Sequence, residues 1–246
     1  MAKAFSTAIA TEKPNVKWDD IAGLKKAKYV LQEAIILPSK FPQLFVGKLR
    51  PWGGILLYGP PGTGKSFLVK ACGSEVQARF FSVDLSDLIT KWLGKSEKLF
   101  RSLFEMPKAS LPAIIFIDET DFLNQSCKSG DNDSSRGVLT QFLVQMQGMY
   151  RDSIRWSVLG ATNKPWEVDR RVIKRLEKRV YVPLPEKSAR KKMFKLHLGD
   201  TPSSLTEEDL EILAEYTEGY SGSDIFSLVK DALMEPKVMV EQEAPY

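Results

Sequence analysis

The sequence of 246 residues has little of three features that would each point to a class of protein. Its two cysteines, Cys72 and Cys127, are far apart and lack metal-site spacing, which indicates free thiols in a reducing compartment. No apolar run approaches the ~20 residues of a membrane-spanning helix. The excess of one sign of charge is also small, because 35 basic and 31 acidic residues leave a net charge of +4. That charge is too small to argue for direct binding of nucleic acid.

The pattern of the chain changes near residue 183, and this change predicts two domains. Before it, short apolar runs typical of buried parallel strands alternate with amphipathic helical segments, which favours a doubly wound α/β domain. The predicted strands are 54–58, 79–83, 113–117, 156–160 and 179–182, and the predicted helices of this part are 67–72, 96–105 and 134–147.

After the stretch PLPE at 183–186, only helical periodicity remains, at 188–198, 206–216 and 223–233. The expected capping residues are Ser188, Thr206 with Asp209 three residues later, and either Ser221 or Ser223. We therefore expect a flexible N-terminal tail over 1–17, a large α/β domain over 18–185 and a small helical lid over 186–246.

The stretch GPPGTGKS at 59–66 matches the phosphate-binding pattern G-x-x-x-x-G-K-[ST] in full. Its glycines let backbone N–H groups approach phosphate oxygens, and the helix that begins at Lys65 points its positive end to the same place. Lys65 would reach the outer phosphates, and the Ser66 hydroxyl would bind Mg²⁺. The sequence therefore predicts ATP and Mg²⁺ as ligands. The predicted nucleotide contacts in this stretch are Gly59, Pro60, Pro61, Gly62, Thr63, Gly64, Lys65, Ser66 and Phe67.

Polar residues follow two further apolar runs. Asp118 and Glu119 end the run AIIFIDE, where Asp118 would hold Mg²⁺ through water and Glu119 would polarise the attacking water. Asn163 ends the run WSVLGATN, within expected reach of the γ-phosphate or that water, although asparagine there can also serve only as a turn residue. These residues predict hydrolysis as well as binding.

The basic run DRRVIKRLEKR at 169–179 has two interpretations that the residues alone leave open. It is either a solvated helix end or the source of an arginine for the γ-phosphate of a neighbouring subunit.

The motifs GPPGTGKS, FIDE, GATN, the basic run before LEKR, and YSGSD resemble AAA ATPases in order and spacing, from about Pro14 to Pro236. The stretches WDDIAGL, DLITKWLGKSEKLF and GATNKPW resemble the meiotic clade and, within it, the Vps4 group, which disassembles ESCRT-III filaments. Katanin and spastin share the clade but fit these stretches less well. The resemblance implies a P-loop NTPase of three α/β/α layers with a five-stranded parallel sheet, followed by a helical lid.

The resemblance also implies roles for particular residues. Lys91, Trp92 and Leu93 would form the first pore loop and grip a threaded polypeptide, with a second pore loop near 125–133. The residues that would enclose the adenine are Ile21 and Ala22 from the large domain and His197, Gly222 and Ser223 from the lid.

Some positions depart from the family pattern. The family usually has two adjacent arginines acting on a neighbour's nucleotide, and here they read Lys174 and Arg175. Because lysine lacks the planar fork of arginine, we expect Arg175 to be the main finger and Lys174 to weaken turnover. Thr120 replaces an apolar residue, Lys95 an acidic one, and Gly137 a longer side chain in a helix. None of these changes removes a catalytic group.

The Vps4 group normally carries an N-terminal recruiting module, the MIT domain, a β insertion and a final helix that this sequence does not show. We expect either a trimmed catalytic cassette or a diverged short form.

The implied partners are an ESCRT-III-type polypeptide and five further copies in a hexamer formed on ATP binding. Contact with endosomal membranes would be transient and only through partners, for a protein otherwise in the cytoplasm. Two alternatives remain: a related motor that severs microtubules, against which Trp92 argues because severing enzymes carry tyrosine there, and a nucleotide-dependent scaffold with little hydrolysis.

Overall fold

The computed structural model describes residues 10–85, 96–106, 112–121, 133–148 and 156–243. Its centre is a six-stranded sheet in the order β1-β3-β4-β5-β2-β6. The strands are β1 (Ala10–Glu12), β2 (Gly54–Tyr58), β3 (Arg79–Asp84), β4 (Ala113–Asp118), β5 (Trp156–Thr162) and β6 (Lys178–Tyr181). Five strands are parallel, which confirms the predicted parallel sheet, and β1 adds an antiparallel edge.

The segment before residue 18 is partly built into this sheet, so the expected flexible tail is wrong for its described part. Ala10 pairs with Ser82 and Glu12 pairs with Phe80. The Ser74 hydroxyl, on α4 (Lys65–Glu75), then donates to the Pro14 carbonyl at 2.9 Å and accepts from the Val16 N–H at 3.0 Å. A strand of three residues is too short to show a pattern, which is why the sequence did not predict it.

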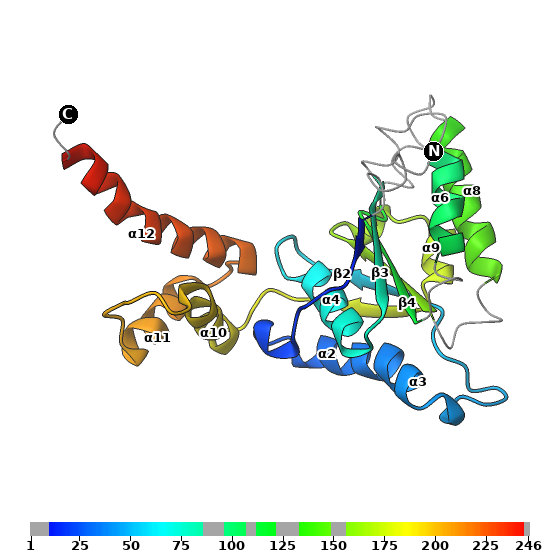
Figure 1. Cartoon of the computed structure of the whole chain (residues 1–246), viewed down its shortest axis with the longest axis horizontal. Helices are drawn as coiled ribbons and strands as arrows, with labels where there is room; N and C mark the ends of the chain where they lie inside the picture. Colours follow the sequence, from blue (N-terminus) through cyan, green and yellow to red (C-terminus); the bar gives the residue numbers. More distant parts are fainter. Residues whose placement is uncertain (1–9, 86–95, 107–111, 122–132, 149–155, 244–246) are drawn as a thin grey trace.

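Helices cover both faces of the sheet, as the alternating pattern predicted (Figure 1). One face carries α6 (Ser96–Glu105), α8 (Asp133–Gly148) and α9 (Arg170–Arg175). The other carries α4 and a helical segment formed by α2 (Lys25–Leu31), the π-helical turn η2 (Gln32–Ile36) and α3 (Leu37–Lys40). The helical segment 25–40 is not among the elements predicted from the sequence.

The core under α6 and α8 is aromatic. Phe100, Phe104 and Phe142 are fully buried, and Phe104 lies 5.2 Å from Phe100, 6.5 Å from Phe142 and 6.2 Å from Trp156, measured between ring centroids. The three phenylalanines belong to the helical spacing that predicted both helices, and Trp156 is the first residue of β5. Packing of this kind holds β4 and β5 rigidly, so the residues at their carboxyl ends have a fixed support.

The lid consists of α10 (Lys187–Leu198), α11 (Glu207–Tyr216) and α12 (Gly222–Glu243), around a small core of Phe194, Leu210, Ile225 and Val229. Among the described helices, none is both long and apolar enough to cross a membrane.

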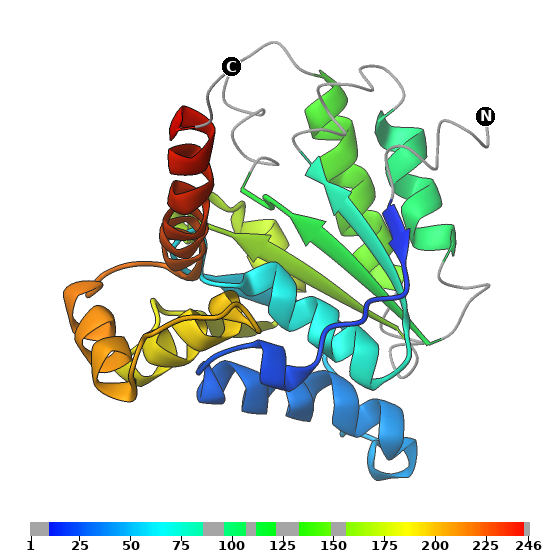
Figure 2. The same cartoon turned by 60° about the vertical axis from the view of Figure 1, so that its left-hand side comes forward.

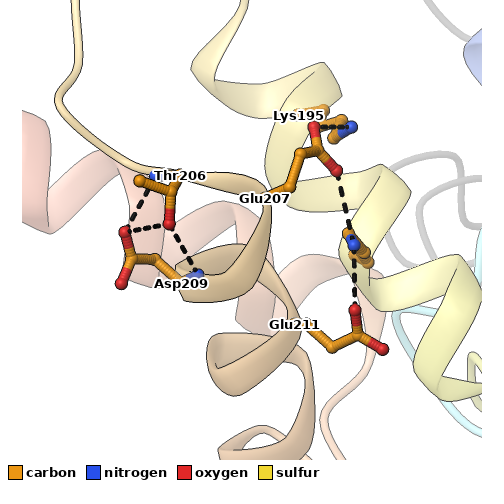
Figure 3. Close-up of polar contacts among 6 residues, drawn as sticks. Lys195, Thr206, Glu207, Asp209 and Glu211 are labelled. Carbon is orange, nitrogen blue, oxygen red and sulfur yellow. Dashed lines mark hydrogen bonds and ion pairs between the residues drawn. The ribbon is translucent and has the colours of Figure 1, made fainter.

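Two of the predicted caps in the lid are confirmed and one is wrong. Thr206 and Asp209 form a reciprocal capping box before α11 (Figure 3). Ser221 and Asp224 bond to each other's backbone N–H in the same way at the start of α12. Ser188 does not cap α10, because that helix already begins at Lys187, which places Ser188 inside its first turn.

Two kinds of polar contact join α10 to α11. On the surface, Lys191 pairs with Glu207 at 3.3 Å and Glu211 at 3.1 Å, and Lys195 pairs with Glu207 (Figure 3). In the interior, the guanidinium of Arg190, only 6% exposed, donates to the carbonyls of Ala214 at 2.7 and 2.9 Å and Pro185 at 2.8 Å. Exposed ion pairs contribute little, whereas removal of a buried donor leaves its acceptors unsatisfied.

We therefore expect Arg190→Met to lower the free energy of unfolding by about 2–4 kcal/mol, because two buried carbonyls lose their donors. The matched control is Lys187→Met, which breaks an exposed pair with Glu215 and should cost less than about 1 kcal/mol. Urea denaturation followed by circular dichroism measures both. Equal losses in the two variants would contradict the assigned role of Arg190.

Candidate active site

The glycine loop leaves β2 and turns into α4 through backbone conformations that suit glycine. Gly62 and Gly64 have φ of +70° and +90°, in the left-handed region. Gly64 occupies the N-cap position of α4 and offers no side chain to cap it. The first N–H groups of the helix therefore face the loop without a side-chain acceptor, as in sites that bind phosphate.

Lys65 lies inside this loop and not in solvent. The residue is 8% exposed, and its Nζ donates to the carbonyls of Gly59 at 3.0 Å and Pro60 at 2.7 Å. Burial lowers the pKa of the Lys65 ammonium, and the nearby Asp118 carboxylate opposes that shift. An anion in the loop would offer this ammonium better partners than neutral carbonyls.

Ser66 and Asp118 bring the loop and β4 together. The Ser66 hydroxyl donates to Asp118 Oδ2 at 3.3 Å, and the Glu119 N–H donates to Asp118 Oδ1 at 2.9 Å. Burial raises the pKa of the Asp118 carboxyl, and the Glu119 N–H opposes this. A cation beside Asp118 would favour its ionised form.

The donor set fits Mg²⁺ that arrives with a nucleotide. A serine hydroxyl and a carboxylate are oxygen ligands of the type that Mg²⁺ prefers. Within the described part of the chain, no group of three or more His, Cys, Asp or Glu side chains could hold a metal by itself. The remaining ligands would thus be phosphate oxygens and water, as is usual for Mg²⁺.

Glu119 and Asn163 follow neighbouring strands, and both side chains are exposed. Glu119 has φ of +51°, a conformation uncommon for residues with a side chain. The next residue, Thr120, is tied to β5, because its N–H and its hydroxyl both donate to the Ala161 carbonyl, at 3.0 and 3.1 Å. The carboxyl ends of β2, β4 and β5 thus bring Lys65, Ser66, Asp118, Glu119 and Asn163 to one edge of the sheet.

The expected adenine-binding segment is buried, and its backbone accepts hydrogen bonds from a lysine of α2. Ile21 and Ala22 are 6% and 2% exposed. Lys28 on α2, which the sequence analysis missed, donates through Nζ to the carbonyls of Trp18 at 2.8 Å and Ile21 at 2.6 Å. Burial lowers the pKa of Lys28, and the nearby ammonium of Lys192 lowers it further. No motif signals this lysine, since its role depends on the turn that it contacts.

The lid meets the loop through the start of α12 (Figure 2). The Ser223 N–H donates to the Gly62 carbonyl at 3.2 Å, and a Cβ on Gly62 would lie 2.5 Å from Ser221 Oγ. The structure therefore brings Gly222 and Ser223 to the phosphate loop, and their expected contact with adenine stays a prediction.

His197 has a different environment. Its ring contacts Phe226 at 5.3 Å between centroids, and it lines an apolar pocket of about 260 Å³ between α10 and α12. Burial lowers its pKa, which favours the neutral ring at pH 7. The contacts described for His197 lie within the lid, so its expected contact with adenine stays a prediction.

Lys174 and Arg175 end α9, away from the loop of their own chain. A Cβ on Gly54, the first residue of β2, would lie 2.5 Å from the Arg175 carbonyl. The five residues of β2 separate Gly54 from the loop by roughly 16 Å. This arrangement does not bring either basic residue to the site in the same chain.

The predicted pore residues Lys91, Trp92 and Leu93 lie outside the described residues. The same holds for Lys95, Cys127 and nearly all of the predicted second pore loop.

Comparisons with known proteins agree with this geometry. Residues 55–184 match the model of the ATPase family associated with various cellular activities (AAA), and 207–236 match the AAA+ lid domain. The chain is 55% identical over 233 residues to vacuolar protein sorting-associated protein 4 of Dictyostelium discoideum, covering 95% of this chain and 52% of that protein. The chain spans about half the length of the curated relatives it matches.

Two solved structures are similar over nearly all of the chain. The FIGL-1 AAA domain in complex with ADP has a TM-score of 0.87 at 37% identity, covering 99% of this chain and 82% of that one. A structure described as the basis for katanin self-assembly has a TM-score of 0.82 at 40% identity, covering 99% and 78%.

The contact between the loop and the lid predicts a difference between two glycine variants. Gly62→Ala and Gly64→Ala both place alanine at positive φ, at a cost of about 1–2 kcal/mol. Only Gly62→Ala also drives a Cβ against Ser221, since nothing lies within 4 Å of a Cβ on Gly64. We expect faster hydrogen exchange of the Ser223 amide in Gly62→Ala but not in Gly64→Ala. Equal exchange in the two variants would rule out a docked α12.

Proposed function

The chain belongs to the AAA ATPase family, and from this we propose that it hydrolyses ATP. We propose further that it works as a ring of identical subunits that pulls ESCRT-III-type polypeptides out of their filaments. The observation that carries the hydrolysis proposal is the hydrogen bond from Ser66 to Asp118, which brings the phosphate-loop hydroxyl and the strand-end acid together at 3.3 Å.

The residues of the site divide the work. Lys65 would exchange the carbonyls of Gly59 and Pro60 for phosphate oxygens. Ser66 would bind Mg²⁺ directly and Asp118 would hold it through water, and the ion would neutralise charge on the phosphates. Glu119 would accept the proton of the attacking water, and Asn163 would orient that water or the γ-phosphate.

The base of the nucleotide would lie between the two domains. Ile21 and Ala22 would contact it from the large domain, and Gly222, Ser223 and His197 would enclose it from the lid. Support comes from the burial of Ile21 and Ala22 and from the bond between Ser223 and Gly62. The large domain, expected over 18–185, and the lid, expected over 186–246, would be the two bodies that nucleotide joins.

The position of Arg175 supports an assembly. Its carbonyl packs at the opposite end of β2 from the phosphate loop, so within one chain the arginine is poorly placed to reach a γ-phosphate. Arg175 would instead reach the γ-phosphate bound by a neighbouring subunit, with Lys174 contributing as a point charge only. A hexameric ring formed on ATP binding would complete every site in this way.

The client is proposed from the relatives. The identity is 55% to the vacuolar protein sorting relative and 40% to the katanin structure, which favours filament disassembly over microtubule severing. Lys91, Trp92 and Leu93 would grip the threaded chain, in the cytoplasm and transiently at endosomal membranes. Disassembly of ESCRT-III filaments, with microtubules as the comparison, tests this choice.

The variant Glu119→Gln tests hydrolysis itself. We expect kcat to fall by about 10²- to 10⁴-fold because the proton acceptor is lost, while ATP is still bound. Lys65→Ala is the counterpart, for which we expect weakened ATP binding. Steady-state phosphate release and binding of a fluorescent ATP analogue measure the two effects. If Glu119→Gln hydrolyses ATP as fast as the unaltered chain, the protein is a nucleotide-binding scaffold or uses another base.

A further inference from the structure

We propose that Asp121 and Thr162 are positioning residues that hold Glu119 and Asn163 in fixed relative positions. The inference rests on the proposed hydrolysis of ATP. Asp121 lies outside the motifs named above, Thr162 has no assigned role although it belongs to GATN, and neither residue is proposed to touch ATP.

The Thr162 hydroxyl is the centre of this arrangement. It donates to Asp121 Oδ1 at 2.6 Å and accepts from the Lys164 N–H at 2.9 Å. Thr162 is 1% exposed, so these bonds are protected from competition with water. Asp121 follows β4 and Thr162 ends β5, and thus the short bond ties the ends of two neighbouring strands.

Asn163 lies between the two partners of that hydroxyl. Thr162 precedes it as the last residue of β5, and the Lys164 N–H follows it and bonds back to the Thr162 side chain. A turn closed in this way restricts the backbone at Asn163, in the manner of turns in which a threonine hydroxyl bonds to a backbone N–H two residues later. The backbone that carries the Asn163 side chain would therefore be held in one conformation relative to β5.

Glu119 is restrained from the other strand. Its N–H bonds to Asp118, and the following Thr120 N–H bonds to the Ala161 carbonyl, which leaves Glu119 at φ of +51° between two anchored neighbours. A left-handed conformation costs about 1–2 kcal/mol at a residue with a side chain and persists only where the surroundings hold it. The bond from Thr162 to Asp121 adds a third anchor, two residues after Glu119.

The site is also close to the phosphate loop. Thr162 pairs with Tyr58, the last residue of β2, and Gly59 follows at once. A small shift of the β5 end would thus move Asn163 relative to both Glu119 and the loop. Misplacement of reacting groups by about 1 Å can reduce rates by about 10²-fold.

Thr120 offers a matched control in the same place. Its hydroxyl and its own N–H share one acceptor, the Ala161 carbonyl. Thr120→Val keeps the shape and the backbone bond, so β4 stays tied to β5. Thr162→Val also keeps the shape, but it removes both the donor to Asp121 and the acceptor for Lys164.

The experiment compares steady-state ATP hydrolysis by Thr162→Val, Thr162→Ser and Thr120→Val with that of the unaltered chain. The protein concentration is high enough that ATP hydrolysis per subunit no longer rises with it, and sedimentation checks that every variant assembles. We expect kcat of Thr162→Val to fall between about 10- and 100-fold, with KM for ATP nearly unchanged. Thr162→Ser, which restores the hydroxyl, and Thr120→Val should both remain close to the unaltered chain.

Asp121→Ala completes a double-mutant cycle. If the two side chains act as one unit, the variant with both Asp121→Ala and Thr162→Val should be no slower than the slower single variant. Additive losses would overturn the proposal.

The proposal would equally be overturned if Thr162→Val kept full kcat, or if Thr162→Ser failed to restore it. An increase in KM in proportion to the loss of kcat would also contradict it, since that pattern belongs to lost ATP binding. These outcomes require an unaltered chain that hydrolyses ATP and a Glu119→Gln variant that does not. Absence of hydrolysis in the unaltered chain would instead defeat the proposed function.

Discussion

The contact between the phosphate loop and the end of β4 is the constraint on which the rest of the site depends. Ser66 and Asp118 are 52 residues apart in sequence, and their hydrogen bond fixes the loop against the strand that also carries Glu119. This contact is rigid because β2, β4 and β5, whose carboxyl ends carry the site, are apolar strands buried on both faces of the sheet. A site built at the ends of such strands needs few interactions of its own, because the sheet already positions its residues.

The lid depends on the same loop. Ser223 bonds to the Gly62 carbonyl, and the glycine is required there because a Cβ would meet Ser221. The core of the lid is small, and the buried guanidinium of Arg190 joins α11 to the segment that links the domains. Because the lid is hydrogen-bonded to the phosphate loop, a ligand that moves the loop would also move the lid. Nucleotide could alter the arrangement of the two domains in this way.

Much of this fold was predictable, for reasons that differ between elements. Three of the parallel strands, β2, β4 and β5, were evident because strands buried on both faces are nearly continuous apolar runs, whereas β3 and β6 have fewer apolar residues and are more exposed. The strand β1 was not, because three residues cannot show a period, and the segment 25–40 was missed although Ala27, Leu31, Ala34 and Ile35 are buried in it. Within the site, motifs predicted the residues of the loop. They could not predict that Lys28 supports Ile21 or that Thr162 bonds to Asp121 across 41 residues, because such pairs depend on tertiary contacts.

The central claim is that ATP is hydrolysed at a site completed by Arg175 of a neighbouring subunit. A complementation experiment tests it most directly: Arg175→Ala and Glu119→Gln proteins, each inactive alone, are mixed and phosphate release is measured. Arg175→Ala subunits keep Glu119, and Glu119→Gln subunits can supply the arginine. The account predicts that the mixture hydrolyses ATP faster than the sum of the two separate proteins. A mixture that hydrolyses no faster than that sum, although the subunits assemble together, would contradict it.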